Sequence, residues 1–394
     1  MTIHAEAVGA DTGPCPVMPT YGPPPVMFVR GEGCWLWDRE GARYLDLLSG
    51  IAVVSLGHAH PEVADAVAQQ ARTLCHVSNL YATEPQMHVA RAIDRLIGGP
   101  AGQVFFANSG AEANECAIKL ARKWAGYGRH TVISAGRSFH GRTLATLHAT
   151  GQAEKHEAFQ PLPEGFRHAP WDDIAEMEKA IDDTTAAVLL EPIQGEGGIN
   201  VCSEGYFRAV RELCDDRGVL LMLDEVQTGL ARTGRWFAHH HDGVEPDVVT
   251  MAKALGNGMP IGACWARTEV AAAFKPGDHA TTFGGQPLAA SAAKATLAVM
   301  EQLDLPARAA AAGETMRAAL QALDGVAGVR GRGLLLGVEL AEGRAAADGV
   351  AAGLAAGLVL GTAGASALRI APPLIISDDE IAHGVAVLEQ LLAP

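Results

Sequence analysis

The sequence is short of positive charge and of aromatic side chains. Its 394 residues hold 30 lysines and arginines against 45 aspartates and glutamates, a formal net charge of −15, and aromatic residues make up only 5% of the chain. A nucleic acid or an anionic membrane would be repelled by such a surface. We therefore expect no nucleic-acid partner and no membrane partner, although a few arginines in a cleft would still attract a small anionic substrate.

The chain also lacks a long hydrophobic run. Its start, Met1–Glu6, shows no basic region followed by an apolar stretch, so we expect no secretory signal. The weakly polar stretch 345–367 is interrupted by Asp348, which favours a packed helix and turn over a membrane span. The seven cysteines are scattered and form no C-x-x-C pair, which favours reduced thiols in a cytoplasmic protein over disulfides or a metal site.

Nucleotide-binding and metal-binding motifs are missing or incomplete. The run Leu221–Glu225 resembles a magnesium-holding strand of nucleotide hydrolases, but these need a Gly-Lys pair, and no lysine here follows a glycine. The G-x-G-x-x-x-G spacings that begin at Gly256 and Gly331 open no first βαβ unit, which disfavours a dinucleotide site. Adjacent side chains in His239–Asp242 would point in different directions, so a solvated loop or helix end is favoured over a metal site.

Short apolar runs alternate with helix-like segments through the middle of the chain. The runs are apolar at every position, which is typical of a mostly parallel sheet covered by helices on both faces. They lie at residues 104–106, 131–133, 186–190, 219–223 and 248–251. The sequence therefore predicts an α/β fold, and its length allows two domains.

The pattern changes near residue 300. We expect a helix over about 291–322, then a glycine-punctuated apolar run at 331–340, a strand near 368–370 and a final helix, which together make a smaller α+β domain. The predicted division is an N-terminal segment that packs with the small domain, a large cofactor-binding domain and the small domain itself, with bounds of 1–55, 56–300 and 301–394.

Lys253 is the most informative residue, because it stands between the apolar run 247–252 and a glycine-rich turn. A lysine at the end of a buried strand loses hydration, so its ammonium form is disfavoured and its pKa falls toward neutrality. A neutral amine can hold an aldehyde cofactor as an imine. Asp224, which ends the run 219–223, can keep a pyridine nitrogen protonated. The two residues together are typical of a pyridoxal phosphate site.

Three further segments place polar groups beside strand ends. The segment 105–114 passes from a strand to a helix, and the free N–H groups at such a helix start, with Ser109, can hold a phosphate, although an ordinary capped helix has the same pattern. Phe139 could stack on a pyridine ring, and Arg142 could clamp a carboxylate. The segment Glu191–Gly198 carries two carboxylates on a glycine loop, which alone would indicate only a solvated loop.

In this order, the motifs resemble those of the class III (ω-amino) aminotransferases, which belong to fold-type I of the pyridoxal phosphate enzymes. The resemblance runs from Tyr21 to Pro373. It implies a large domain with a mostly parallel seven-stranded sheet, a smaller α+β domain, and a homodimer with active sites at the interface. The motifs that carry it lie at residues 56–61, 108–114, 139–142, 191–196, 224–229, 252–256 and 281–285.

The resemblance implies a role for each matching residue. Lys253 would bind pyridoxal 5'-phosphate and shuttle the substrate proton, and Asp224 would pair with the ring nitrogen. Phe139 would stack on the ring, and Gln227 would reach its phenolic oxygen. The implied cofactor contacts are Ser109, Gly110, Ala111, Phe139, Glu191, Asp224, Glu225, Val226, Gln227 and Lys253, with Thr282 supplied by the partner subunit.

Within the class, the motifs are most similar to those of enzymes that act on N2-acetyl-L-ornithine. Arg142 would bind the carboxylate of that donor, and Arg369 the α-carboxylate of glutamate or 2-oxoglutarate. Glu196 would neutralise Arg369 when an amine without a nearby carboxylate approaches, because an unpaired buried arginine is costly. Thr281 completes the implied substrate contacts. The products would be N-acetyl-L-glutamate 5-semialdehyde and L-glutamate, as in arginine biosynthesis.

Some positions depart from the pattern of the class. Ile51 stands where ornithine aminotransferases carry a tyrosine that helps to hold a free α-amino group, which favours an acylated donor. Ala111 replaces a common threonine near the phosphate, and Gln286 replaces an asparagine near the expected dimer contact.

Other activities remain open at this point. The donor could be succinylornithine, ornithine, 4-aminobutyrate or a carrier-linked lysine, and the same cofactor serves aminomutases and decarboxylating transaminases. The pairing of Glu196 with Arg369 argues for 2-oxoglutarate use, which an internal aminomutase does not need. A non-catalytic regulator is a third hypothesis, and the intact Lys253, Asp224 and Arg142 argue against it.

Overall fold

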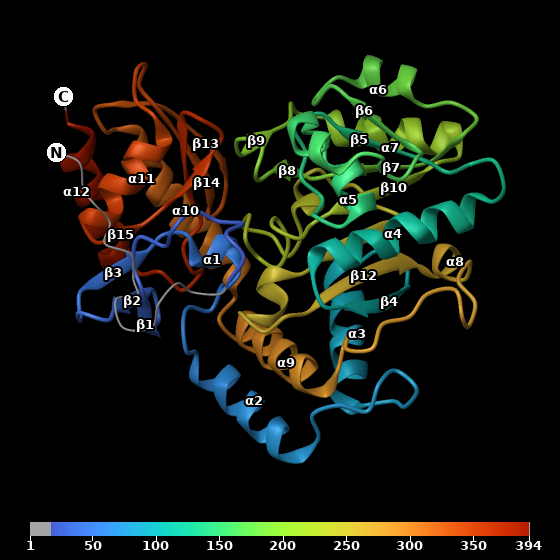
Figure 1. Ribbon diagram of the computed structural model, residues 1–394, viewed down its shortest axis with the longest axis horizontal. Coiled ribbons are helices and arrows are strands. Elements are labelled where there is room, and N and C mark those ends of the chain that lie inside the picture. Colours follow the sequence, from blue (N-terminus) through green and yellow to red (C-terminus); the bar gives the residue numbers. More distant parts are fainter. Residues whose placement is uncertain (1–16, 394) are drawn as a thin grey trace.

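The computed structural model describes residues 17–393 and consists of a large sheet covered by helices beside a smaller unit built from both ends of the chain (Figure 1). The large sheet has seven strands: β4 (Gly102–Ala107), β5 (Thr131–Ala135), β6 (Phe166–Ala169), β7 (Thr185–Leu190), β10 (Leu220–Asp224), β11 (Val248–Met251) and β12 (Gly262–Arg267). The helices are α1 (Ser49–Ala52), α2 (Pro61–Thr73), α3 (Glu84–Ile97), α4 (Gly110–Ala125), α5 (Leu144–Ala149), α6 (Ile174–Ala180), α7 (Tyr206–Arg217), α8 (Thr268–Ala271), α9 (Pro287–Gln302), α10 (Leu305–Gln321), α11 (Ala346–Ala355) and α12 (Asp378–Leu392).

The large sheet is mostly parallel, as the sequence predicts. Its strand order is β4-β12-β11-β10-β7-β5-β6, and the five strands from β11 to β6 pair in parallel. Only β12 runs against its neighbours β11 and β4. All five predicted apolar runs form strands of this sheet. Strands β6 and β12, which complete the sheet, were not predicted.

Both faces of this sheet are buried, which explains why its strands are apolar at every position. In β7, Ala187 and Leu189 pack on the side of α4, whereas Val188 and Leu190 pack on the side of α6 and α7. Successive side chains of a strand point to opposite faces, so a strand between two helix layers needs apolar residues at all positions.

The smaller unit contains a four-stranded sheet with the order β13-β14-β17-β16. A second sheet joins the N-terminal strands to β15, and in Figure 1 the blue strands lie beside the orange and red C-terminal elements. These strands are β1 (Phe28–Glu32), β2 (Trp35–Asp38), β3 (Arg43–Asp46), β13 (Val326–Arg332), β14 (Leu335–Leu340), β15 (Leu358–Val359), β16 (Gly361–Ala363) and β17 (Ala367–Ile370). On these pairings we propose domain bounds of 1–55, 56–300 and 301–394, of which residues 1–16 and 394 lie outside the described part.

Two expectations for this part of the chain need correction. The helix predicted over 291–322 is two helices, α9 and α10. They separate at Asp304, whose φ of 46° is not helical, and Pro306 in the first turn of α10 has no N–H to continue the helix. The apolar run at 331–340 divides between β13 and β14, which form a hairpin that turns at Gly333, where φ is 54°.

The remaining expectations concern cysteines, metals and membranes. The six cysteines within residues 17–393 are free thiols, and Cys15 lies outside that range. In the same part of the chain, no cluster of three or more His, Cys, Asp or Glu side chains could hold a metal ion. None of the described helices is both long and apolar enough to span a bilayer.

Candidate active site

The site residues lie at one edge of the large sheet, where the carboxyl ends of its parallel strands meet. Asp224 ends β10 and is paired in register with Thr250 of β11, three residues before Lys253. Loops after β5 and β7 reach the same edge. This edge is where ligands bind in open α/β sheets. A cavity of about 390 Å³ lies there, and its lining includes Ser109, Gly110, Ala111, Asn114, Phe139, His140, Arg142, Glu191, Glu196, Asp224, Val226, Gln227 and Lys253.

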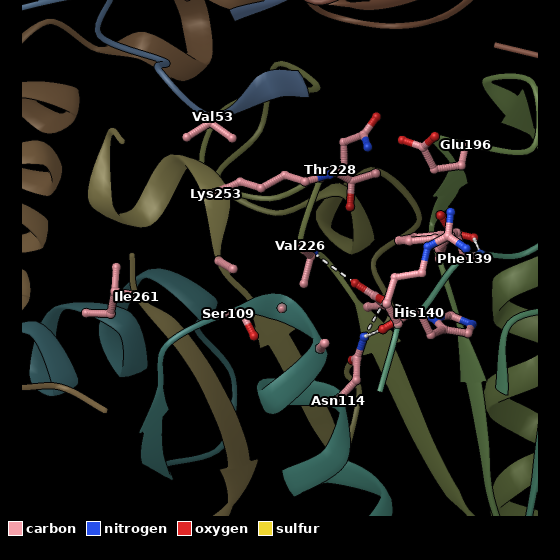
Figure 2. A pocket seen from close by; sticks show the side chains of 18 of the residues that line it. Val53, Ser109, Asn114, Phe139, His140, Glu196, Val226, Thr228, Lys253 and Ile261 are labelled. Carbon is pink, nitrogen blue, oxygen red and sulfur yellow. Dashed lines mark hydrogen bonds and ion pairs between the residues drawn. The ribbon is translucent and has the colours of Figure 1, made fainter. Parts of the chain in front are cut away.

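Lys253 begins the 3-10 turn η4 (Lys253–Gly256) and extends into the cavity (Figure 2). Burial lowers the pKa of Lys253 to about 8, and the guanidinium of Arg369 acts in the same direction. The nearby carboxylates of Glu196, Asp224 and Glu191 limit the fall. The amine is therefore partly neutral near physiological pH, as a lysine that bonds to a carbonyl carbon requires.

Asp224 is held by a buried network of hydrogen bonds. Its Oδ2 accepts from Nδ2 of Asn114 at 2.8 Å and lies 2.8 Å from Nδ1 of His140. Its Oδ1 accepts from the backbone N–H of Val226 at 3.1 Å. Asn114 is in turn oriented by Thr250, whose hydroxyl donates to its Oδ1 at 2.6 Å. A carboxylate oriented in this way can keep a cationic ring nitrogen protonated.

The start of α4 forms a cradle for an anion. Ser109 is its N-cap, and the Ser109 hydroxyl accepts from the N–H of Glu112 at 3.2 Å. A side-chain carbon at Gly110 would lie 2.8 Å from the side chain of Val226, so only glycine leaves the approach open. The free N–H groups and the helix dipole at this end attract a phosphate.

The segment after β5 carries an aromatic ring and an arginine that also line the cavity. The guanidinium carbon of Arg142 lies 5.5 Å from the centre of the Phe139 ring. Glu191 holds this segment in place, because its Oε2 accepts from the N–H of Phe139 at 3.0 Å and its Oε1 from that of Gly195 at 3.2 Å. Burial and the neighbouring charge of Asp224 raise the pKa of Glu191 well above its usual value, which favours the protonated form.

Glu196 and Arg369 form an ion pair at the rim of the cavity. Nη2 of Arg369 donates to Oε2 of Glu196 at 2.8 Å, and Nη1 donates to Oε1. Arg369 also donates to the carbonyl of Thr362 and is 5% exposed. Burial alone would raise the pKa of Glu196, but Arg369, together with Lys253 and Gln227, lowers it below its usual value. The structure thus brings together the two residues that the resemblance pairs.

Four residues predicted for the site are not among those that line the cavity, and one of them, Arg369, reaches it through its ion pair with Glu196. The side chain of Glu225 faces away from the cavity, because its carboxylate accepts from the hydroxyl of Thr228, the backbone N–H groups of residues 238 and 239, and the ring of His239. Thr281 holds the loop beside β4 by accepting from the N–H of Gly284 at 3.1 Å. Thr282 is exposed and does not line the cavity of its own chain.

The sequence motifs contain two contributors that received no role, Asn114 and His140. Both side chains are buried against Asp224 (Figure 2). A signal for Asn114 was present, since it follows Gly110 by four residues on α4 and therefore lies on the same face of the helix. For His140 we find no comparable signal, because its contact depends on the path of the loop after β5.

The residues of the site fit pyridoxal phosphate. A phosphate suits the start of α4, a cationic ring nitrogen suits Asp224, and an aldehyde suits the lysine amine. Oε1 of Gln227 is buried and has no hydrogen-bond partner among the described residues, so it can accept from a polar group of a ligand. When bound, the cofactor supplies a ring that accepts electrons from the substrate carbon.

Comparison with known proteins places the chain in a family. The family model for class-III aminotransferases matches residues 17–392, and the chain belongs to this family of pyridoxal phosphate-dependent enzymes. It is 48% identical over 381 residues to the acetylornithine aminotransferase of Methanothermobacter thermautotrophicus, which covers 96% of each chain. It is 50% identical over 386 residues to the acetylornithine aminotransferase of Gloeobacter violaceus, again over 96% of each chain.

Solved structures agree with this assignment. The ornithine aminotransferase of Toxoplasma gondii superposes with a TM-score of 0.91 at 34% identity and covers 95% of this chain and 92% of that one. The acetylornithine aminotransferase of Elizabethkingia anophelis gives a TM-score of 0.83 at 34% identity and covers 95% of each chain. The protein is therefore an aminotransferase with the fold of fold-type I enzymes.

Proposed function

We propose that the protein transfers the δ-amino group of N2-acetyl-L-ornithine to 2-oxoglutarate, which gives N-acetyl-L-glutamate 5-semialdehyde and L-glutamate in arginine biosynthesis. The main support is the ion pair between Glu196 and Arg369 beside Lys253. Such a pair suits an enzyme that must accept both an amine with no adjacent carboxylate and an α-amino acid. The names of the relatives at 48% and 50% identity point to the same donor.

The residues of the chain have distinct tasks in this proposal. Lys253 would hold the cofactor through its amine, and once free that amine would take the proton from the carbon that bears the amino group. Asp224, positioned by Asn114 and His140, keeps the ring nitrogen protonated. Phe139 covers one face of the ring.

The remaining contacts hold the two ends of the cofactor and its substrates. Ser109, Gly110 and Ala111 hold the phosphate, while Gln227 accepts from the ring hydroxyl.

Two arginines recognise carboxylates in the two halves of the reaction. Arg142, exposed at the mouth of the cavity, binds the carboxylate of the acylated donor. During this half Glu196 neutralises Arg369, because a buried guanidinium without a partner is costly. When glutamate or 2-oxoglutarate enters, its α-carboxylate replaces that of Glu196 on Arg369, which offers a bidentate site.

Ile51 supports an acylated donor rather than free ornithine. The residue is 44% exposed and lies two positions before Val53, which lines the cavity. An aliphatic side chain offers no hydrogen bond to a free α-amino group. Another ω-amino transaminase activity remains the alternative, and the ornithine aminotransferases among the solved neighbours keep it open.

The expected assembly and location belong to the same proposal. We infer a cytoplasmic homodimer in which Thr282 of the partner subunit contacts the phosphate and Thr281 contacts the substrate. The exposed position of Thr282, outside the cavity of its own chain, is compatible with service to a neighbouring site.

A panel of amine donors tests the reaction. The purified protein, saturated with pyridoxal phosphate and 2-oxoglutarate, would be given acetylornithine, succinylornithine, ornithine or 4-aminobutyrate, and glutamate formation would be measured. We expect the highest kcat/KM with acetylornithine. The variant Ile51→Tyr should raise the relative rate with ornithine. A preference for 4-aminobutyrate or free ornithine in the unaltered protein would refute the assignment of the donor.

A further inference from the structure

The loop that carries Glu196 is held in an unusual backbone conformation. It joins the two short strands β8 (Ile193–Gln194) and β9 (Asn200–Val201). Gly198 has φ 134° and Ile199 has φ 54°. A β-branched residue in the left-handed region is strained, so the surrounding structure must hold it there. Ile199 is fully buried, and the packing around its side chain helps to keep this conformation.

Two arginines hold the carbonyl groups that directly follow Glu196. Nη2 of Arg137 donates to the carbonyl of Gly197 at 2.7 Å, and Nε of Arg330 donates to that of Gly198 at 2.6 Å. A side-chain carbon at Gly198 would lie 3.5 Å from Nη2 of both arginines, so the two guanidinium groups converge on one turn. Hydrogen bonds from charged donors are among the stronger ones in proteins.

The two arginines come from different parts of the molecule. Arg137 follows β5 of the large sheet, and Arg330 lies in β13 of the small sheet. Arg369 belongs to β17 of that same small sheet, two strands away from β13. The small sheet therefore holds the carboxylate of Glu196 through Arg369 and the carbonyl of Gly198 through Arg330. Arg137 links the same loop to the large sheet.

We propose that Arg137 and Arg330 are positioning residues that fix the backbone behind Glu196, so that only its side chain moves when Arg369 is released. This inference rests on the proposed function, in which Arg369 must be neutralised for the ω-amine and free for the α-amino acid. If the backbone moves, the carboxylate of Glu196 no longer stays within hydrogen-bonding distance of Arg369. The ω-amine half of the reaction then suffers, while the α-amino-acid half does not.

The two halves can be measured separately from the same starting state. The cofactor-loaded protein would be mixed in a stopped-flow instrument with acetylornithine or with glutamate, and the loss of the cofactor's long-wavelength absorbance recorded. We expect Arg330→Ala to lower the second-order rate with acetylornithine about tenfold, as the loss of one charged hydrogen bond implies. The rate with glutamate should stay the same or rise. Arg137→Ala should shift the ratio in the same direction.

The control variant is Glu339→Gln. Glu339 pairs with Nη1 of Arg330 at 2.7 Å, so this change removes the ion pair on β14 but keeps the bond to Gly198. We expect no change in the ratio of the two rates. A shift as large as that of Arg330→Ala would overturn the proposal, because it would place the effect on the strand rather than on the loop.

A binding measurement supplies a second readout that does not depend on turnover. Glutarate, a non-reacting five-carbon dicarboxylate, would be titrated into the cofactor-free protein by calorimetry. It should bind several-fold more tightly to Arg330→Ala, because Glu196 then competes less for Arg369. The proposal would be overturned if the arginine variants lost the same fraction of their rate with acetylornithine and with glutamate. It would also be overturned if the affinity for glutarate were unchanged in both variants.

Failure of the proposed function gives a different result. In that case the unaltered protein would react with glutamate but not with acetylornithine. The positioning role would then be tested with whichever ω-amine the panel identifies.

Discussion

Lys253 shows how a single side chain acquires its chemistry from its surroundings. Its amine lies in the cavity near the acidic groups of Glu196, Asp224 and Glu191 and the guanidinium of Arg369, and burial has the largest effect on its pKa. The depressed pKa is a cost to the folded protein, because the unfolded chain would keep the proton to higher pH. That cost is compatible with a functional site, where unfavourable burial of a titratable group is common.

The pH dependence of Lys253 can be measured in the cofactor-free protein. Only the neutral amine reacts with an aldehyde, so labelling by pyridoxal phosphate under reducing conditions should rise with pH with a midpoint near a pKa of about 8. Glu196→Gln should move the midpoint lower, since Glu196 is the strongest of the groups that raise this pKa. Quantification of the labelled peptide by mass spectrometry checks both values. A midpoint near 10.5, the ordinary lysine value, would contradict the assignment.

The same shift predicts a slope in stability. Between pH 8 and 10.5 the unfolded chain holds a proton at Lys253 that the folded protein lacks, so this group makes stability rise with pH over that window. Lys253→Met should lack this contribution. Thermal unfolding of the two cofactor-free proteins at several pH values provides the comparison, and parallel curves would count against the shift.

The network around Asp224 predicts graded effects on rate. Asn114→Ala removes one charged hydrogen bond to Asp224, so the rate of the half-reaction with glutamate should fall about tenfold to a hundredfold. Thr250→Val removes only the hydroxyl that orients Asn114, so its effect should be smaller. Stopped-flow rates with glutamate rank the variants. An Asn114→Ala variant as fast as the unaltered protein would show that the network does not position Asp224.

Among the elements, α4 links stability to the cofactor most directly. Its N-cap, Ser109, supports the first turn, and the same turn presents N–H groups to a phosphate. The final helix α12 offers a comparison, because its N-cap Ser377 forms a capping box with Glu380 far from the cavity. Both serines cap a helix, but only Ser109 also lines the cavity.

Replacing each N-cap serine separates these tasks. Ser109→Ala and Ser377→Ala should each lower the free energy of unfolding of the cofactor-free protein by about 1 kcal/mol. Only Ser109→Ala should also weaken cofactor binding, by severalfold. Chemical denaturation and fluorescence titration with pyridoxal phosphate measure the two quantities. Equal cofactor affinity in both variants would remove Ser109 from the phosphate site.

In the molecule as a whole, buried side chains tie the large sheet to both ends of the chain. Arg232 is almost fully buried and donates to the carbonyls of Leu334 and Pro372 and to the hydroxyl of Ser55. It therefore joins the loop after β10 to the N-terminal segment and to the smaller unit. Each of these groups would be costly to bury without a partner.

The proposed dimer can be tested by subunit complementation. Lys253→Ala should abolish activity, and Thr282→Asp should do so by repelling the phosphate in the partner's site. In a mixed dimer, one site carries both changes and the other carries neither. Random reassortment of equal amounts should thus restore about a quarter of the original activity. Each variant incubated alone is the control, and no recovery on mixing would contradict an interface site.

Much of the fold followed from local patterns. Buried strands between two helix layers must be apolar at every position, so β4, β5, β7, β10 and β11 were predicted as runs. The break between α9 and α10 was missed, because apolar periodicity continues across Asp304. Strand β12 was missed because its cysteine, tryptophan and arginine do not form a simple run, and its antiparallel place depends on its neighbours.

Local patterns in the sequence likewise predicted part of the site but not all of it. Lys253 and Asp224 were predictable because each ends a buried run, and the ends of parallel strands meet at one edge. The side chain of Glu225 does not line the cavity, because successive side chains at a strand end point to opposite sides. One therefore faces the cavity and the next faces His239.

By itself, the sequence determined the class of fold and the importance of Lys253 and Asp224, because burial and periodicity can be read from residues that are neighbours in the chain. Only the tertiary structure decided which polar groups meet across more than a hundred residues, such as Asn114 with Asp224 and Arg330 with Gly198. The reason is physical. A hydrogen bond depends on distance and direction to within a fraction of an ångström, and the packing of separate elements sets both.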